Sequence, residues 1–345
     1  MAISPVNGYP KTSVFYPPEW HKQKAIWLSY PHNLNEWNDI RLKPIRAFYH
    51  ELIKLILEFQ DINLVFANED LKNNFPTIQG KFKVNPIVIP NNDIWIRDYG
   101  PFFVFNNNKI EMLDFEFNAW GEKFPPWNLD NEVPAQIEKI LSYPRSSFDM
   151  VLEGGALEFN GDGVILTTKQ CLLNSNRNPH LNQNQIEKNL KNVFNIDDVI
   201  WLERGLEGDH TDGHIDDFAR FYDYNKVFLC ASDDATNPNY QHLKDSFEVL
   251  SKWKHSNKKY NLEVTLLPMP VIMKLDGEYL PNSYANFIFL NGAVIVPTFD
   301  CPQDEIALEI FCKALPSHQV IGLNSRLLVE EGGGLHCMSK QEPSL

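Results

Sequence analysis

The stretch that decides the fold is residues 149–168, DMVLEGGALEFNGDGVILTT. A short apolar run is followed by the turn EGG and by two further apolar segments, which are joined by NGDG. Asn-Gly and Asp-Gly pairs between apolar runs are typical of β-hairpins. The preceding residues 131–143, NEVPAQIEKILSY, place apolar side chains at helical spacing. The stretch therefore predicts a helix, a strand, a polar turn and a hairpin.

The same unit recurs along the chain. Repetition of one supersecondary unit is typical of closed radial arrays, and no Gly- or Ser-rich linker interrupts the series. We therefore expect a single α/β domain over residues 1–345, built as a five-fold pseudo-symmetric α/β propeller of strand–hairpin–helix units. A plain α/β sheet is the structural alternative. The strand, turn and hairpin of the other copies fall at 85–115, 198–231 and 262–299, and a last strand at 318–324 leads into 327–340.

Composition and charge narrow the possible partners and location. The chain has 345 residues, of which 43% are hydrophobic, and a net charge of −14. This charge disfavours nucleic acid and anionic membranes as partners. No window approaches the ~18 apolar residues of a membrane span, and residues 1–13 lack the apolar region of a secretory signal. The five scattered cysteines form no CxxC pair, so a disulfide framework and a thiolate zinc site are disfavoured and a cytoplasmic location is expected.

Each copy of the unit places a polar or reactive side chain at the bend between strand and hairpin. If the copies surround one axis, these side chains converge in a central cleft. Each also has an ordinary structural interpretation, such as a surface ion pair between Asp98 and Arg97 or a core histidine on a strand at position 214. Their repeated placement favours a shared site. In chain order they are Trp95 and Asp98, Glu153, His214 and Asp216, Asn286, and Cys337.

The chemistry of this set suits a guanidinium ligand. Three glycines, 332–334, precede Cys337 by two residues and permit a sharp bend or close approach. A cysteine attacks as its thiolate, and a histidine can manage the protons of the reaction. Carboxylates grip a planar guanidinium through its forked N–H groups, and a tryptophan can form a wall against the cation. No metal and no organic cofactor is needed for this reaction.

The sequence resembles the agmatine deiminases, within the guanidine-modifying superfamily that includes the bacterial-type peptidylarginine deiminases. The resemblance covers nearly the whole chain, and its segments together are highly specific. They are PPEWHKQKAIWLSYPHN (17–33), IWIRDYGPFFV (94–104), FEFNAWGEKF (115–124), EGGALEFNGDGVILTTKQCLLNSNRNP (153–179), WLERGLEGDHTDGHIDDFARF (201–221), NSYANFIFLNGAVIVP (282–297) and EEGGGLHCMSKQEP (330–343).

The resemblance implies a propeller of the pentein type and a role for each site residue. Cys337 corresponds to the nucleophile and His214 to the general acid and base. The reaction implied is hydrolysis of agmatine to N-carbamoylputrescine and ammonia through an amidino-cysteine intermediate, on a polyamine route. We also expect a homodimer or a higher homo-oligomer. The carboxylates of the guanidinium site correspond to Asp98, Glu153 and Asp216, and further substrate-binding positions to Trp95, Trp120, Asn286 and Gly334.

One loop departs from the family pattern. Members commonly read Asn-x-Trp-Gly-Gly-Lys where this chain has residues 118–123, NAWGEK, so that Glu122 replaces a glycine. Glu122 either favours an amine at the far end of the substrate or is a solvated loop residue, and the second interpretation is preferred.

Other functions compete with agmatine deimination. Peptidylarginine or free-arginine deimination uses the same chemistry, and the latter needs a cationic partner for the α-carboxylate. A metallohydrolase is suggested by His210 and His214, four residues apart beside several aspartates. A non-catalytic guanidine or polyamine binder is a further alternative. The cysteines at 171, 230 and 312 are expected in the core, and Cys301 at a helix entry.

Overall fold

The computed structural model describes residue 6, residues 8–33 and residues 39–345. It has a mixed α/β fold, in which one pairing pattern recurs in five sheets of the described residues: the first strand runs antiparallel to the second, and the second runs parallel to the third. The first of these sheets contains β4 (Phe102–Asn106), β5 (Lys109–Glu116) and β6 (Arg145–Val151). Each hairpin is therefore joined to the strand that follows the next helix.

Three more sheets repeat this arrangement along the chain. In each, two strands form a hairpin and the third returns parallel to the second after a helical connection. They are β7 (Glu158–Phe159), β8 (Val164–Thr168) and β9 (Asp198–Leu202); β10 (Ala219–Asp223), β11 (Lys226–Ala231) and β12 (Glu263–Pro268); and β15 (Ile288–Leu290), β16 (Ala293–Thr298) and β17 (Gln319–Asn324).

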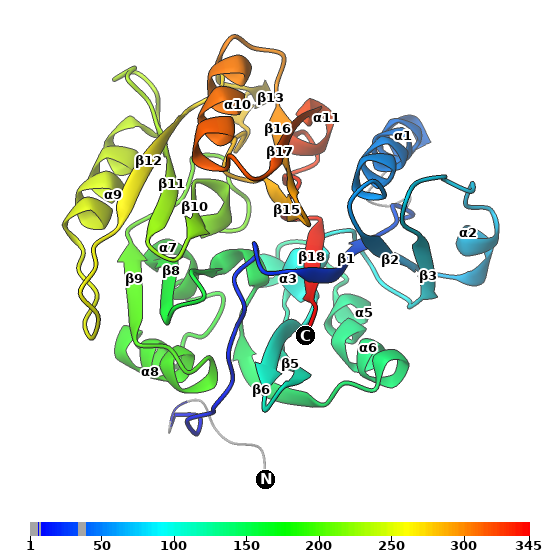
Figure 1. Cartoon of the computed structure of the whole chain (residues 1–345), viewed down its shortest axis with the longest axis horizontal. Helices are drawn as coiled ribbons and strands as arrows, with labels where there is room; N and C mark the ends of the chain where they lie inside the picture. Colours follow the sequence, from blue (N-terminus) through cyan, green and yellow to red (C-terminus); the bar gives the residue numbers. More distant parts are fainter. Residues whose placement is uncertain (1–5, 7, 34–38) are drawn as a thin grey trace.

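The fifth sheet is made by the two ends of the chain. The C-terminal β18 (Ser339–Pro343) pairs antiparallel with β1 (Gln23–Ser29). On its other side β1 pairs parallel with β2 (Asp61–Phe66), which pairs parallel with β3 (Val84–Val88). Figure 1 shows β18 in red against β1 in blue. The last repeat, in which a strand at 318–324 was expected to lead into 327–340, is thus completed by a strand from the other end of the sequence. A further two-stranded sheet pairs β13 (Lys274–Leu275) with β14 (Glu278–Tyr279).

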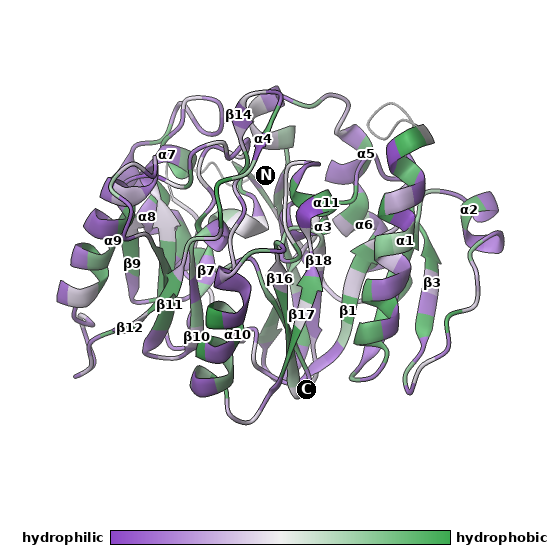
Figure 2. Ribbon diagram, turned by 90° about the horizontal axis from the view of Figure 1, so that it is seen from above, coloured by the Kyte–Doolittle hydropathy of each residue, from purple (hydrophilic) through white to green (hydrophobic). Residues whose placement is uncertain are grey.

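The long helices lie at the outside of the molecule, with the strands inside them (Figure 1). In α1 (Asp39–Ile56), the side chains of Ile45, Tyr49, Leu52 and Ile56 recur at helical spacing and are fully buried. The helices around the strands are banded in hydropathy while the strands are largely hydrophobic (Figure 2). The helices are α1 (Asp39–Ile56), α2 (Glu69–Asn73), α3 (Ile96–Tyr99), α4 (Ala119–Glu122), α5 (Asn128–Asn131), α6 (Val133–Leu141), α7 (Lys169–Leu172), α8 (Gln183–Val193), α9 (Tyr240–Lys252), α10 (Gln303–Ala314), α11 (Arg326–Val329), and the 3-10 turns η1 (Gly154–Ala156) and η2 (Ile215–Asp217).

The candidate site residues occupy the connections that enter the first strand of each sheet. Asp98 lies in α3 before β4, and Glu153 immediately precedes η1 before β7. His214 immediately precedes η2, in the connection between strand and hairpin where the sequence predicted it, and is not on a strand. The backbone N–H groups of Gly213 and His214 donate to Asp209 at 2.9 and 2.8 Å, and these bonds hold the segment in a turn. Asn286 precedes β15 and Cys337 precedes β18.

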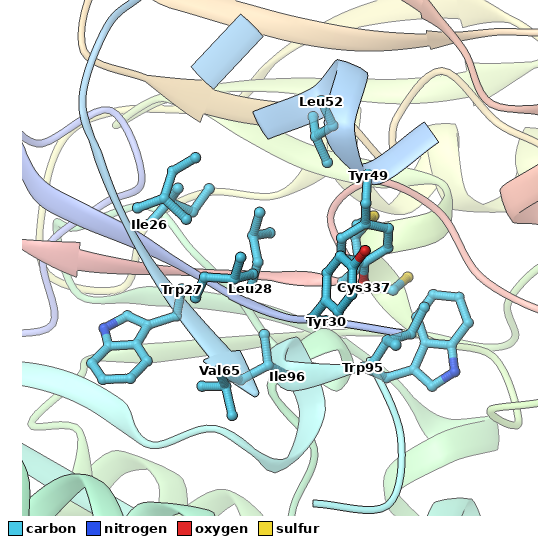
Figure 3. Packing of buried hydrophobic residues seen from close by; sticks show 14 of the residues in the cluster. Ile26, Trp27, Leu28, Tyr30, Tyr49, Leu52, Val65, Trp95, Ile96 and Cys337 are labelled. Atoms are coloured by element: carbon cyan, nitrogen blue, oxygen red, sulfur yellow. The ribbon is translucent and has the colours of Figure 1, made fainter. Parts of the chain in front are cut away.

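One large hydrophobic cluster extends to the site itself. It joins side chains of β1, α1 and β2 to Trp95, Ile96 and Cys337 (Figure 3). Trp95 and Cys337 are 6% and 7% exposed, so both are nearly buried while still reaching the cavity described below. The packed core therefore fixes one wall of the site.

Candidate active site

The glycine segment brings Cys337 close to two of its expected neighbours. A Cβ atom added at Gly333 would lie 2.4 Å from the ring of Trp95, and one added at Gly334 would lie 2.2 Å from Asn286 Oδ1. Gly332 adopts a φ of +101°, in the left-handed region that favours glycine. The three glycines are therefore required by close packing and by one bend, as the sequence predicted.

Asn286 holds the cysteine and the backbone beside it. Its Nδ2 lies 3.2 Å from Cys337 Sγ and donates to Asp217 Oδ1 at 2.9 Å. Its Oδ1 accepts a hydrogen bond of 2.8 Å from the backbone N–H of His336. Asp216 Oδ2 lies 3.9 Å from Cys337 Sγ. One amide therefore fixes the sulfur against the acidic pair at 216 and 217.

Asp98 and His214 face each other behind the cysteine. His214 is 1% exposed, and its Nδ1 lies 3.8 Å from Asp98 Oδ1 and 4.0 Å from Asp216 Oδ1. Asp98 accepts hydrogen bonds from Trp120 Nε1 at 2.9 Å and from the Gly155 N–H at 2.8 Å. A Cβ at Gly155 would lie 2.7 Å from His214 Nδ1, so only glycine fits between the two groups. The second glycine of the EGG turn thus has a direct packing role.

Glu153 has a partner that the sequence did not indicate. Its Oε1 accepts a hydrogen bond of 2.5 Å from Arg177 Nε, and Arg177 also binds Asp212 at 2.8 Å. Both side chains of the Glu153–Arg177 pair are fully buried. Glu153, His214 and Cys171 each present a ligand-type atom within 4.8 Å of the others. Cys171 therefore packs in the core, as expected, but directly against the candidate catalytic histidine.

Several buried polar atoms in this cluster lack a hydrogen-bond partner within the described residues. They are both ring nitrogens of His214, Glu153 Oε2 and Asp216 Oδ1. A buried polar atom without a partner is costly, and folded proteins contain few of them. Four such atoms in one cluster, one of them on Asp216 beside the Cys337 thiol, indicate that a polar ligand completes their bonding.

Electrostatics keep the thiol neutral when no cation is present. Burial raises the pKa of Cys337 well above its ordinary value, and the negative charges of Asp216, Asp217 and Asp98 raise it further. Burial alone would lower the pKa of His214, but Asp98 and other neighbours raise it well above its ordinary value. A bound cation among the carboxylates would reverse their effect on the sulfur. The arrangement therefore suits nucleophile activation by the substrate.

A cavity leads to Cys337, which is one of its lining residues. Of the candidate site residues, four line it, while Glu153, His214, Asp216, Asn286 and Gly334 lie behind that surface. Four carboxylate residues line it, and none of the described lining residues is a lysine or an arginine. The lining residues are Asp93, Trp95, Asp98, Trp120, Phe124, His210, Thr211, Asp217, Glu331, Gly332, Gly333 and Cys337.

The structure corrects several sequence-based interpretations. Arg97 is 3% exposed and binds Glu19 at 3.0 Å, so it does not form a surface pair with Asp98. His210 lines the cavity while His214 is buried behind it, and within the described chain no candidate metal-ligand cluster contains His210. Glu122 is exposed and absent from the cavity lining, which agrees with a solvated loop residue. Cys312 is exposed and does not pack in the core as predicted.

Three buried residues of this region were missed by sequence reasoning. Glu19, Arg220 and His336 form an ion-pair network beneath the site. Glu19 lies in the segment PPEWHKQ, and His336 immediately precedes Cys337. The spacing of Glu19 and His336 along the sequence does not indicate that the two residues are in contact.

Comparison with known proteins decides the family. The model of the Porphyromonas-type peptidyl-arginine deiminase family matches residues 15–343. The chain belongs to this family. It is 33% identical to an agmatine deiminase of Pseudomonas putida over 98% of both chains. The family resemblance seen in the sequence is therefore confirmed.

Solved structures of relatives agree with this assignment. The chain superposes on a cysteine-to-serine variant of the C. jejuni agmatine deiminase with substrate bound, with a TM-score of 0.89, 37% identity and 96% of each chain covered. The agmatine deiminase of Enterococcus faecalis gives a TM-score of 0.89 at 30% identity, over 97% of this chain and 100% of that one. Among the described residues, no helix is long and apolar enough to cross a membrane.

Proposed function

We propose that this chain hydrolyses agmatine to N-carbamoylputrescine and ammonia. The observation that carries the proposal is a thiol in the lining of a carboxylate-lined cavity, next to Asp216, whose buried Oδ1 is one of four polar atoms in this region that lack a partner within the described residues. A guanidinium supplies N–H donors to such acceptors. Relatives over the full length of the chain are agmatine deiminases, one of them with substrate bound. The enzyme is thus a C–N hydrolase that acts on a small cationic amidine.

The cavity lining favours an amine-tailed substrate. Asp93 and Glu331 line the cavity together with Phe124 and His210, and Glu331 also forms an ion pair with Arg41. A free arginine would bring its α-carboxylate toward these acidic groups, whereas agmatine presents a primary ammonium. The charge balance of the lining residues therefore supports agmatine over arginine.

The residues divide the chemistry in the following way. The guanidinium is gripped by Asp98, Asp216 and Glu153, with Trp95 and Trp120 as walls and Asn286 and Gly334 shaping the sulfur side. Its positive charge favours loss of the thiol proton to solvent. Cys337 Sγ then bonds to the central carbon, and a C–N bond breaks as ammonia leaves with a proton from His214. An amidino-thioether remains on the enzyme.

Hydrolysis returns the enzyme to its starting state. His214, now neutral, takes a proton from a water that attacks the same carbon. The C–S bond breaks to give a protonated ureido group and the Cys337 thiolate. The ureido group loses one proton to solvent, and the thiolate takes up a proton as the product leaves. Each step uses only side chains of this chain, the substrate and water.

The finer architecture is part of the proposal. The pairing pattern shared by five sheets supports a pseudo-five-fold α/β propeller in a single catalytic domain over residues 1–345. The five cysteines are all free, which supports a reducing, cytoplasmic location. Assembly into a homo-oligomer stays a prediction, and light scattering of the purified protein would test it.

A substrate panel tests the function. Purified protein is supplied separately with agmatine, free arginine and a blocked arginine peptide, and both ureido product and ammonia are quantified. Product from agmatine in large excess over the others is expected. Product mainly from the peptide would assign protein modification, and binding of agmatine without product would leave a non-catalytic site.

A further inference from the structure

The side chain of His336, next to the cysteine, lies between two carboxylates. Its Nδ1 is 2.6 Å from Asp216 Oδ2, and its Nε2 is 2.6 Å from Glu19 Oε1. His336 is 1% exposed, so both contacts lie away from bulk solvent. These contacts therefore join His336 to Asp216 and to Glu19, which lies 317 positions away from His336 in the sequence.

These two contacts require more protons than a neutral ring can supply. A neutral imidazole carries one N–H, and its other nitrogen is an acceptor. Two short contacts from one ring to carboxylate oxygens therefore need either an imidazolium or a protonated carboxyl group. Burial, Arg220 and Arg97 lower the pKa of His336 below its ordinary value, although Glu19 and Asp216 oppose them. The two short contacts, and not this pKa direction, place one proton more on the three groups than a neutral imidazole and two carboxylates would hold.

Ion pairs and hydrogen bonds hold the side chains of Glu19, His336 and Asp216 in place. Glu19 binds Arg97 at 3.0 Å through Oε1 and Arg220 at 2.6 Å through Oε2. Arg97 Nε donates to the backbone carbonyl of His336 at 3.2 Å, and Arg220 binds Glu158 at 2.8 Å. The imidazole ring and the backbone carbonyl of His336 are therefore both fixed by groups outside the substrate cavity. The other titratable groups that face these three side chains are Lys340, His214, Asp98, Asp217 and Cys337.

The consequence falls on Asp216. His336 occupies its Oδ2, while Oδ1 has no hydrogen-bond partner within the described residues and lies 4.0 Å from His214 Nδ1. An Asp216 side chain released from His336 could rotate and offer either oxygen, or turn away. The histidine therefore determines which oxygen of Asp216 remains without a partner beside His214.

We infer that His336, clamped by Glu19, is a positioning residue that holds Asp216 ionised and aims its Oδ1 at the guanidinium. This inference rests on the proposed function. It assigns a role in the reaction to two residues, Glu19 and His336, that do not line the cavity. It also explains why a buried imidazole is placed directly beside the nucleophile, where an apolar side chain would be simpler to pack.

The test compares three substitutions at position 336. In H336A the donor to Asp216 is lost, so the pKa of Asp216 rises and the ionised form disappears at a higher pH. The acid limb of kcat/KM for agmatine should move upward by about one to two pH units, with a fall in kcat/KM of roughly 10- to 100-fold at neutral pH. In H336N the amide can donate to Asp216 from a similar position and should restore most of both. H336L, matched to Asn in size, should behave like H336A.

Controls separate positioning from mere packing. His242 is 8% exposed in α9 and its Nε2 lies 3.0 Å from Asn239 Oδ1, so H242A removes another buried, hydrogen-bonded imidazole. H242A should lower the melting temperature but leave the acid limb in place. If H336A fails to fold, the comparison of H336N with H336L decides. An unmoved acid limb in H336L, or equal losses in H336N and H336L, overturns the inference. Agmatine turnover by the unmodified protein is measured first, and its absence would instead reject the proposed function.

Discussion

At the scale of single residues, the site combines a neutral thiol with an excess of negative charge. Burial and three aspartates raise the pKa of Cys337, and Asp98 raises that of His214. The resting site is therefore unreactive toward neutral electrophiles. A cation bound between Asp98 and Asp216 removes the main electrostatic obstacle to forming the thiolate. Under the proposed function, selectivity for guanidinium and activation of Cys337 thus have the same physical cause.

A charge-matched pair of alkylating reagents tests this coupling. Chloroacetamidine is cationic and chloroacetamide is neutral, while their reactive carbons are alike. The ratio of their rates should be at least about tenfold larger at Cys337 than at the exposed Cys312, because a shift of one pKa unit changes the thiolate fraction about tenfold. Peptide mapping of each alkylated cysteine gives the two ratios from one sample.

The pH dependence provides a second check on the same reagents. Labelling of Cys337 by the neutral reagent should rise as the pH passes above the ordinary range of a thiol, since its pKa is raised. Equal reagent ratios at the two cysteines would show that the carboxylates do not couple the thiol to a cation.

At the scale of elements, short connections carry the site and the sheets only position them. Residues 332–337 are an example, because Gly333 and Gly334 leave no room for a side chain against Trp95 and Asn286. The sequence indicated this bend through three glycines. It did not indicate that Ile215–Asp217 form a 3-10 turn, because His-x-Asp spacing suits a strand and the bonds to Asp209 form only in the fold.

Replacing Gly333 by alanine tests the close approach. The added Cβ would lie 2.4 Å from Trp95, so the indole or the segment must move, and kcat/KM for agmatine should fall by about 10-fold or more. Gly292 is the control, because a Cβ there meets nothing within 4 Å although its φ is +82°. Gly292→Ala should cost about 1 kcal/mol of stability and leave kcat/KM unchanged.

The glycine comparison has a clear contrary outcome. Wild-type kcat/KM in Gly333→Ala, with Trp95 fluorescence unchanged, would mean that the approach of the indole to the segment is not needed for activity. Denaturant melts of both variants show whether any loss of activity merely follows a loss of stability.

At the scale of the whole molecule, the pairing of β1 with β18 unites the ends of the sequence. It brings Glu19, near the start of the described chain, against His336 beside the nucleophile. Local patterns predicted the hairpins and the residues at their bends, since alternation and turn residues act over a few positions. They could not predict the Glu19–His336 contact or the burial of Arg97, because these depend on which distant strands pair.

The central claim is that Cys337 forms a covalent bond with the guanidinium carbon. The most direct measurement is rapid-quench mass spectrometry of the protein during turnover of agmatine, with peptide mapping. We expect an amidine adduct on the Cys337 peptide that forms and decays at least as fast as turnover. Cys337→Ala should fold normally and give neither adduct nor N-carbamoylputrescine. Sustained turnover by Cys337→Ala, or an adduct on another residue during turnover, would contradict the account.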